Sequence, residues 1–467
     1  MKRRDKMKSE LVEKLEDIVG NDWVVTGKEA VLDYLMDETA PTVCPKPAAD
    51  VVLVKPSTPQ EISSILKLAN EWKVPVFPRG GGTGLVGGSV PTESGVVLSL
   101  ERMNRVIEVD TENLMVVVEA GVKLEELMEA VDEAGLLFPP HPGDETAQVG
   151  GLVACNAGGA RAVRYGVMRN YVKGIEVVLP TGEILNLGGK LLKDVAGYDL
   201  MHLMIGSQGT LGVITKVILR LYPKFKETAT LIILYGDRHE ALRTVPRILQ
   251  EGMIPLAIEY VERELMEKSA KQLGKGWPVK KGKACLMMIV TGNRKEEVYL
   301  DAERIDKIAR EYNAIDTLVV ESRRKQEDIL SIRSNIYLIL KPYAMDVLDV
   351  AVPPASIAKL MDALDEIAKK YNMYLPMVGH AGDGNLHPII LMKKAGGVKE
   401  EALEKVKKEI YHITIGLGGT ITAEHGIGKI RIKDLNQYLD EKAIEIMKKI
   451  KKVFDPNNIL NPGTVVP

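Results

Sequence analysis

The sequence predicts an α+β protein with two domains and a C-terminal segment. Strand-like runs and helical patterns mix in the first half without the strict strand–helix repeat of a doubly wound sheet. Near Tyr222-Pro223-Lys224 the glycine density falls and the amphipathic helices lengthen, which indicates a boundary. We therefore expect a first domain at 1–222, a cap domain at 223–423 and a further segment at 424–467.

The first domain opens with a β–α–β pattern. A strand-like run at 50–54 precedes Thr58-Pro59-Gln60-Glu61, a capping box with proline at the first helical position. Apolar residues at helical spacing follow at 62, 65, 66 and 69, and strand-like runs at 74–77 and 96–100 flank a glycine-rich loop. Further on we expect strands at 106–109 and 115–119, a helix near 124–134, and a hairpin at 174–187 that turns on Pro180-Thr181-Gly182.

In the cap domain strands alternate with longer helices. This pattern is typical of two α/β repeats that form one largely antiparallel sheet. The expected strands are 228–235, 255–261, 286–291, 346–352 and 374–378, and the expected helices are 238–252, 294–312, 323–341 and 355–372.

Composition excludes several classes of function. The 62 Lys and Arg residues almost balance the 64 Asp and Glu residues, so net charge points to no nucleic-acid partner. The three cysteines are far apart and form no metal or disulfide pattern. The N-terminus is basic but continues into an amphipathic helical pattern instead of a signal peptide, and the apolar run at 284–290 is too short to cross a membrane. We expect a cytoplasmic protein, at most peripheral to a membrane.

The segment from Pro78 to Gly88 is the most informative part of the chain. Six glycines in nine positions, 80–88, build a loop whose backbone N–H groups can wrap a pyrophosphate. Gly82-x-Gly84-x-x-Gly87 matches the Rossmann fingerprint, but a strand-like run follows it where that motif needs a helix. The loop also lacks the Gly-Lys-Ser/Thr ending of a P-loop, so both readings are excluded.

Three more motifs follow in order: Gly150 to Gly159 with Arg164-Tyr165-Gly166, Gly197 to Leu200, and Gly206 to Thr215. Together the four motifs resemble the FAD-binding domain of the vanillyl-alcohol oxidase / p-cresol methylhydroxylase superfamily, and most closely its glycolate oxidase D-subunit and D-lactate dehydrogenase branch. The resemblance implies a cofactor site that is lined largely by backbone. Its residues would be Arg79, Gly80, Gly81, Gly82, Thr83, Gly84, Gly87, Gly88, Pro142, Gly143, Gly150, Gly151, Ala154, Asn156, Gly158, Gly159, Tyr165, Gly209, Gly212, Val213, Ile214 and Asn461.

The resemblance also implies the architecture. It predicts a two-part FAD-binding domain of the p-cresol methylhydroxylase type, an α/β cap, and a C-terminal segment that returns to the FAD domain. The ending Asp455 to Gly463 matches the family, although Thr464 stands where a lysine commonly follows.

Two histidines flank a Gly-Asp-Gly turn in His380-Ala381-Gly382-Asp383-Gly384-Asn385-Leu386-His387. If strands flank this turn, the imidazoles converge, and Glu424 would complete a site of two histidines and one carboxylate with an open position. On spacing alone, polar core or surface histidines are an equal alternative. The resemblance favours a divalent metal, with zinc as our expectation.

The resemblance assigns two further roles. His425 corresponds to the family's general base, with a second metal ligand or a packed imidazole as the alternatives. Arg333 corresponds to the arginine that clamps the substrate carboxylate, with a solvated helix arginine as the alternative.

The implied reaction is oxidation of a D-2-hydroxy acid to the 2-oxo acid by hydride transfer to flavin. The 2-hydroxyglutarate-oxidising relatives carry a lysine and an asparagine where this chain has Val347 and Ile389, which points to a small or apolar acid of the D-lactate or glycolate type. No NAD site is visible, so we expect a quinone, an iron–sulfur protein or another redox partner as electron acceptor. An oxidase that reduces O₂ and, more remotely, a metal-dependent hydrolase are alternatives. A homodimer is our expectation, but the sequence leaves the assembly open.

We predict that FAD is bound without a covalent link. Superfamily members that tether the flavin often do so through a histidine in the pyrophosphate loop, and here Thr83 stands in its place. Acid precipitation should therefore release all the yellow colour into the supernatant. Flavin retained in the denatured pellet would contradict this prediction.

Overall fold

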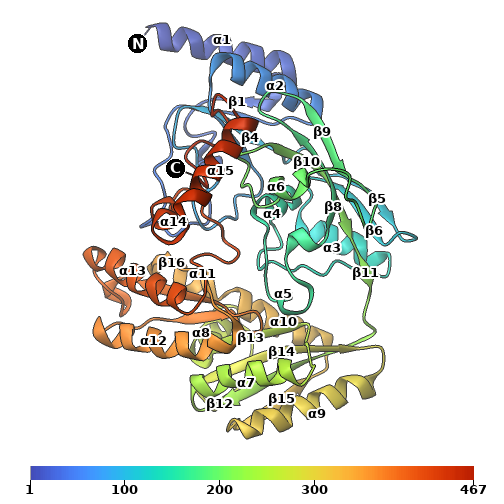
Figure 1. The fold of residues 1–467 in the computed structure, drawn as a ribbon, viewed down its shortest axis with the longest axis vertical. Helices are drawn as coiled ribbons and strands as arrows, with labels where there is room; N and C mark the ends of the chain where they lie inside the picture. The colour runs from blue at the N-terminus through green and yellow to red at the C-terminus, as the bar shows by residue number, and fades with distance from the viewer. Residues whose placement is uncertain (1, 467) are drawn as a thin grey trace.

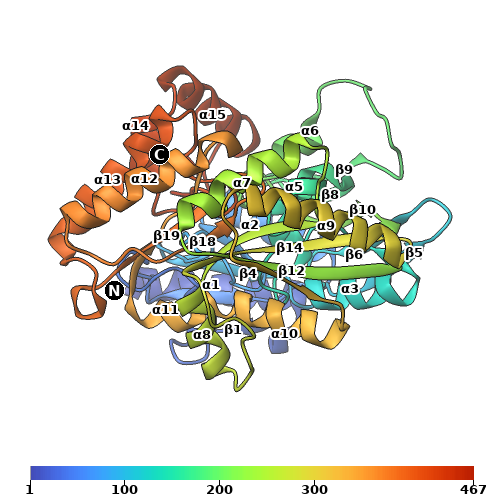
Figure 2. The same cartoon turned by 90° about the horizontal axis from the view of Figure 1, so that it is seen from below.

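The computed structural model describes residues 2–466, so that Met1 and Pro467, the outer ends of the predicted first domain and C-terminal segment, lie outside it. Figures 1 and 2 show two bodies of mixed helix and sheet, with the C-terminal helices beside the N-terminal elements. The mixed α+β class that the sequence predicts is confirmed.

A small sheet with the order β1-β2-β4-β3 carries the glycine loop. Strands β2, β4 and β3 are parallel, and the side chains of Ile62 and Ile65 on the covering helix α2 are fully buried. Helix α2 begins as predicted, because the Thr58 hydroxyl accepts a hydrogen bond from the Glu61 amide at 3.1 Å. The bounds are α1 Lys2–Val19, β1 Val24–Val25, β2 Val51–Val54, α2 Pro59–Trp72, β3 Val76–Arg79 and β4 Gly95–Ser99.

A second sheet, with the order β5-β6-β10-β8-β9, is antiparallel throughout. Helices α3 and α4 pack into the same apolar core, and the predicted hairpin is present, with Gly182 at φ +93° in its turn. The bounds are β5 Val106–Asp110, β6 Met115–Glu119, α3 Leu124–Glu133, β7 Leu136–Leu137, α4 Val149–Cys155, α5 Ala162–Tyr165, β8 Val172–Val178, β9 Ile184–Gly188, α6 Leu200–Met204, β10 Val213–Arg220 and β11 Tyr222–Pro223.

The third sheet, with the order β15-β12-β14-β13-β18-β19-β16, is also antiparallel. Helices cover both faces, because alternate residues of β12 point to opposite sides: Leu231 packs with α7, α9, α12 and α13, and Ile232 packs with α8, α10 and α11. The bounds are β12 Glu227–Tyr235, α7 Arg238–Gln250, β13 Ala257–Glu262, α8 Arg263–Gln272, β14 Ala284–Gly292, α9 Lys295–Glu311, β15 Asp316–Val320, α10 Arg323–Ser334, α11 Ile336–Leu340, β16 Ala344–Val347, β17 Val350–Ala351, α12 Ile357–Lys370, β18 Met377–His380, β19 Asn385–Leu391 and α13 Glu400–Gly416.

The cap departs from the sequence prediction at several places. The helix expected at 323–341 is divided into α10 and α11 at Asn335. The side-chain amide of Asn335 donates hydrogen bonds to the side chains of Ser269 and Gln272 in α8. This tertiary contact outweighs the helical pattern of the sequence. The strand expected at 374–378 begins three residues later, and α8 and the edge strand β15 were not predicted.

The C-terminal segment returns to the first sheet, as the resemblance implied. After α14 (Ile432–Tyr438) and α15 (Glu441–Phe454), the chain runs beside β3, where the Val76 amide donates to Ile459 O at 2.7 Å and the Asn461 amide donates to Val76 O at 2.8 Å. Figure 1 shows α14 and α15, in red, in the same half of the molecule as the N-terminal elements. No helix among residues 2–466 is long and apolar enough to cross a membrane.

We predict that Asp455 holds this return in place. Its buried carboxylate pairs with Lys451 Nζ at 2.6 Å and accepts hydrogen bonds from the amides of Ile459 and Leu460. Asp455→Ala leaves the Lys451 ammonium without its counter-ion, and breaking a buried pair in this way costs about 3–5 kcal/mol. Denaturant unfolding should show the loss. Glu445→Ala on the exposed face of α15 is the matched control, and an equal effect of both variants would contradict the assignment.

Candidate active site

The glycine loop after β3 has the properties of an anion cradle. Within residues 2–466, the amides from Gly80 to Val86 donate no hydrogen bond to the protein. Gly82 and Gly87 have φ values of +73° and +70°, which side-chain-bearing residues rarely adopt. These free N–H groups match what a pyrophosphate requires.

Buried acceptors without donors surround the same loop. Gln148 Oε1 lies 3.5 Å from the position that a Cβ on Gly80 would take, and Asp37 Oδ2 lies 3.7 Å from that of Gly84. Neither oxygen has a hydrogen-bond partner among the described residues. A ligand that brings hydroxyl and N–H groups as well as phosphates, as FAD does, would satisfy both kinds of group, so the residues present fit this cofactor.

Several other predicted cofactor residues contact this loop or each other. Asn461 donates its side-chain amide to Gly88 O and Gln208 O, and the Gln208 amide donates to Ala154 O. Three further predicted cofactor glycines have close neighbours. A Cβ on Gly81 would contact Thr146 O, one on Gly159 would contact His141 O and Pro142, and one on Gly209 would contact Pro78.

Other predicted cofactor residues have a different setting. The Arg79 guanidinium is buried behind the loop, where it donates to the carbonyl oxygens of Asp33 and Met36. Val213 and Ile214 place their side chains in the apolar cores, and Tyr165 packs against Tyr222.

The three predicted metal ligands converge. His380 ends β18 and His387 lies in β19, so the turn between two paired strands brings both imidazoles to Glu424. The Nε2 atoms of His380 and His387 lie 3.2 Å and 3.3 Å from Glu424 Oε1. Both distances are those of hydrogen-bonded pairs, and they are also close to the roughly 3.3 Å that separates two ligand atoms about 2.0–2.1 Å from one tetrahedral ion.

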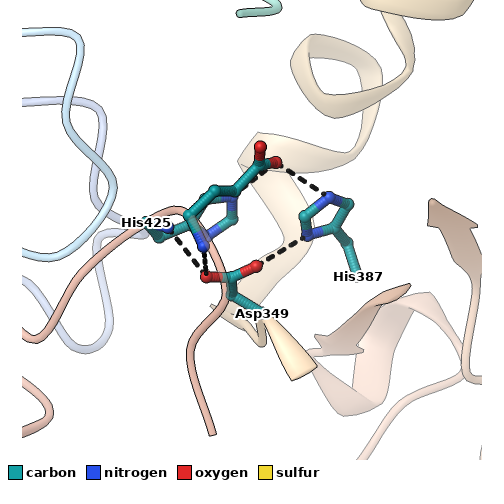
Figure 3. Close-up of side chains that lie close together, drawn as sticks. Asp349, His387 and His425 are labelled. Carbon is teal, nitrogen blue, oxygen red and sulfur yellow. Dashed lines mark hydrogen bonds and ion pairs between the residues drawn. The ribbon is translucent and has the colours of Figure 1, made fainter. Parts of the chain in front are cut away.

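Asp349 belongs to the same cluster, although the sequence did not single it out. Ligand atoms of Asp349, His387, Glu424 and His425 all lie within 4.8 Å of one another. Asp349 Oδ2, however, already accepts from Thr422 Oγ1 and from the amides of residues 423, 424 and 425, at 2.7–2.8 Å. Asp349 therefore anchors the loop that carries Glu424 and His425, as the dashed lines in Figure 3 show, and we do not count it as a ligand.

The turn after Glu424 brings His425 into the same pocket. Its ring stacks on His387 with centroids 4.9 Å apart, and its Nε2 lies 4.0 Å from Glu424 Oε1. The sequence left open whether these consecutive residues point apart, and the structure brings both side chains into the same cluster, where the amides of both residues donate to Asp349 Oδ2. Burial lowers the pKa of His425, which favours its neutral form.

Arg333 reaches the cluster through Glu259, a residue that the sequence did not reveal. Arg333 Nη2 lies 2.8 Å from Glu259 Oε2, and Glu259 Oε1 lies 2.6 Å from His380 Nδ1. Burial alone would raise the pKa of Glu259, but the charges of His380 and Arg333 outweigh it and lower this pKa. Burial would likewise lower the pKa of His380, but Glu259 and Glu424 raise it well above its usual value.

The cluster borders the glycine-rich segments of the first domain. A Cβ on Gly158 would lie 2.6 Å from Glu424 Oε2, and the Gly428 amide donates to Gln208 Oε1 at 2.7 Å. The predicted cofactor and metal sites therefore face each other across one boundary.

Two protein-family models match the chain. Residues 224–465 match the model described as FAD linked oxidases, C-terminal domain, and residues 51–188 match the model described as FAD binding domain.

Curated relatives cover nearly the whole chain. A D-lactate dehydrogenase of Archaeoglobus fulgidus is 44% identical over 93% of this chain and 95% of its own length. Glycolate oxidase subunit GlcD of Bacillus subtilis is 39% identical over 88% of each chain. Among solved structures, p-cresol methylhydroxylase superposes with a TM-score of 0.78 over 97% of this chain and 96% of its own, at 17% identity, and so shares the fold.

We predict that Gly82→Val removes FAD from the purified protein. The substitution forces a side chain into φ +73° and drives a Cβ to within 2.1 Å of the Arg79 guanidinium, which displaces the loop. Flavin absorbance per chain measures the loss. Arg79→Ala should do less harm, because the cradle binds through backbone groups.

Gly135→Val is the control for backbone strain alone. Gly135 has the same φ of +73°, and no atom lies within 4 Å of its Cβ position. This variant should lose stability but keep its flavin. Full flavin occupancy in Gly82→Val would refute the cradle.

Proposed function

This chain belongs to the family of FAD-linked oxidases and is an FAD-linked oxidoreductase, and from that premise we propose that it oxidises a small D-2-hydroxy acid to the 2-oxo acid. The observation that carries the proposal is the convergence of His380, His387 and Glu424 beside a buried arginine, at the boundary with the cofactor loop. The whole-length similarity to D-lactate dehydrogenase and GlcD supports an acid of the D-lactate or glycolate type.

Two groups external to the chain supply the redox and Lewis-acid chemistry: when bound, FAD takes up two electrons with the hydrogen of the substrate Cα, and a divalent metal lowers the pKa of the substrate hydroxyl. His380, His387 and Glu424 would hold the metal, and we propose zinc from the ligand set. FAD would bind to the 80–88 loop without a covalent bond, because Thr83 stands where family members that tether the flavin often have a histidine.

Arg333 binds and orients the substrate carboxylate in this proposal. Its Nε is buried and has no hydrogen-bond partner among residues 2–466, so a planar donor is available inside the site. A guanidinium that pairs with a carboxylate fixes both the position and the plane of the acid.

His425 accepts the hydroxyl proton. Its Nε2 lies 4.0 Å from Glu424 Oε1, the oxygen that the imidazoles of His380 and His387 also face. A substrate hydroxyl bound beside Glu424 would therefore lie near the His425 imidazole, whose neutral form is favoured by burial and can accept the proton. The ring stacks on His387, and only 12% of the His425 side chain is exposed.

The surroundings of Val347 and Ile389 support a small substrate. Both side chains are buried in an apolar cluster. The guanidinium of the nearby Arg431 already pairs with the Asp346 carboxylate, with Nη1 2.5 Å from Oδ2. A second substrate carboxylate would find no free charge at these positions.

The domain division remains part of the proposal. We assign 1–222 to the FAD-binding domain, 223–423 to the cap and 424–467 to the returning segment. The acceptor is proposed as a quinone, an iron–sulfur protein or another redox partner, and the ratio of peroxide formed to D-lactate consumed tests it against an O₂-reducing oxidase.

We predict that chelation of the metal abolishes flavin reduction by D-lactate while FAD stays bound, since the cofactor rests on the other domain. His387→Ala should behave in the same way, because a site left with two protein ligands rarely retains zinc. His425→Ala should keep about one metal ion per chain but slow the reduction by roughly 10²–10⁴-fold.

Metal analysis combined with stopped-flow bleaching of the flavin band measures both quantities for each variant. Full metal content with full activity in His387→Ala would show that this cluster is structural and that the proposed chemistry is wrong.

A further inference from the structure

Glu259 is a buried carboxylate that divides its two oxygens between two parts of the candidate site. Only 2% of its side chain is exposed. Oε2 pairs with Arg333 Nη2 at 2.8 Å, and Oε1 lies 2.6 Å from His380 Nδ1. One carboxylate thus joins the predicted substrate clamp to a predicted metal ligand.

The fold fixes this arrangement through strand register. Glu259 in β13 is directly opposite His380 in β18, so backbone pairing sets the distance between their side chains. Arg333 comes from the last turn of α10, which packs on the same sheet. The backbone positions of both partners relative to Glu259 are thus set by the sheet and by the helix that packs on it.

The contact with His380 has a chemical consequence. A proton on Nδ1 that is donated to Glu259 leaves the lone pair on Nε2, and Nε2 is the atom that lies 3.2 Å from Glu424 Oε1. Carboxylates placed in this way orient metal-binding histidines and raise their basicity. The contact with Arg333 leaves Nε of the guanidinium buried and without a protein partner.

We propose that Glu259 is a positioning residue that sets the spacing between the substrate carboxylate clamp and the metal site. The inference rests on the proposed function and deepens it. A 2-hydroxy acid bound through its carboxylate at Arg333 and through its hydroxyl at the metal spans a fixed length, and Glu259 holds both ends of that span.

Glu259→Gln tests this role because an amide cannot replace both oxygens. One oxygen remains to accept from either His380 or Arg333, while the NH₂ group faces the other donor. We expect Zn²⁺ affinity to fall about 10–100-fold, measured by competition with a chromophoric chelator. We also expect the KM for D-lactate, measured by flavin reduction at saturating Zn²⁺, to rise roughly 10-fold or more, as for a weakened hydrogen bond to a charged group.

Glu262→Gln is the matched control. Glu262 ends the same strand, and its carboxylate is also largely buried and contacts Arg238 and Tyr374. This variant should keep both the Zn²⁺ affinity and the KM of the wild type. If Glu262→Gln shows the same two losses, the effect is general destabilisation and the proposal is overturned.

If folded Glu259→Gln kept the Zn²⁺ affinity and the KM of the wild type, the proposal would also be overturned. The contacts of Glu259 with Arg333 and His380 would then be only structural. Should Glu259→Gln not fold, Glu259→Asp keeps the charge but is one methylene too short to reach both partners, and the same two losses are expected. A wild-type protein that neither binds Zn²⁺ nor oxidises D-lactate would instead contradict the proposed function.

Discussion

The candidate site depends on the contact between the Asp349 carboxylate and the loop at 422–429. One oxygen of Asp349 accepts from three backbone amides and one hydroxyl, more donors than its two lone pairs can each bind singly. Because the amides belong to residues 423–425, this contact fixes the backbone from which Glu424 and His425 project. Burial alone would raise the pKa of Asp349, but the neighbouring His425 and His387, together with the His425 amide, outweigh it and lower this pKa.

The other edge of this loop is held by the first domain. Gln208 accepts from the Gly428 amide, and the Lys429 amide donates to Val86 O in the glycine loop. The Lys429 ammonium reaches Asn461 and Thr464 of the C-terminal segment at 2.8 Å and 2.7 Å. The loop thus contacts the cofactor cradle and the returning segment while it is anchored in the cap. One short segment therefore connects the proposed cofactor site to the proposed metal site.

Local motifs made a large part of this arrangement predictable. The glycine loop, the helix that Thr58 caps, and the two histidines that flank a turn all owe their structure to residues within about ten positions of each other, so the sequence alone reveals them. Glu259 was not predictable, because its role arises from strand register with His380 and from a helix some 70 residues later. Asp349 did give a signal, since it is a lone acid in the apolar run from Val347 to Val352, but its partners come from a distant loop. The break between α10 and α11 depends on α8, a helix that the sequence pattern did not indicate.

The charges of the cluster bear on the proposal that it binds a divalent ion. Three buried carboxylates, those of Glu259, Asp349 and Glu424, meet one obligatory cation, Arg333, when the histidines are neutral. Two negative charges remain, and isolated charges in a low-dielectric interior are costly. Burial alone would lower the pKa of His380, but the nearby carboxylates of Glu259 and Glu424 raise it well above its usual value. In the proposed function a divalent ion would offset the two remaining negative charges, and the imidazole Nε2 atoms 3.2 Å and 3.3 Å from Glu424 Oε1 would serve as its ligands.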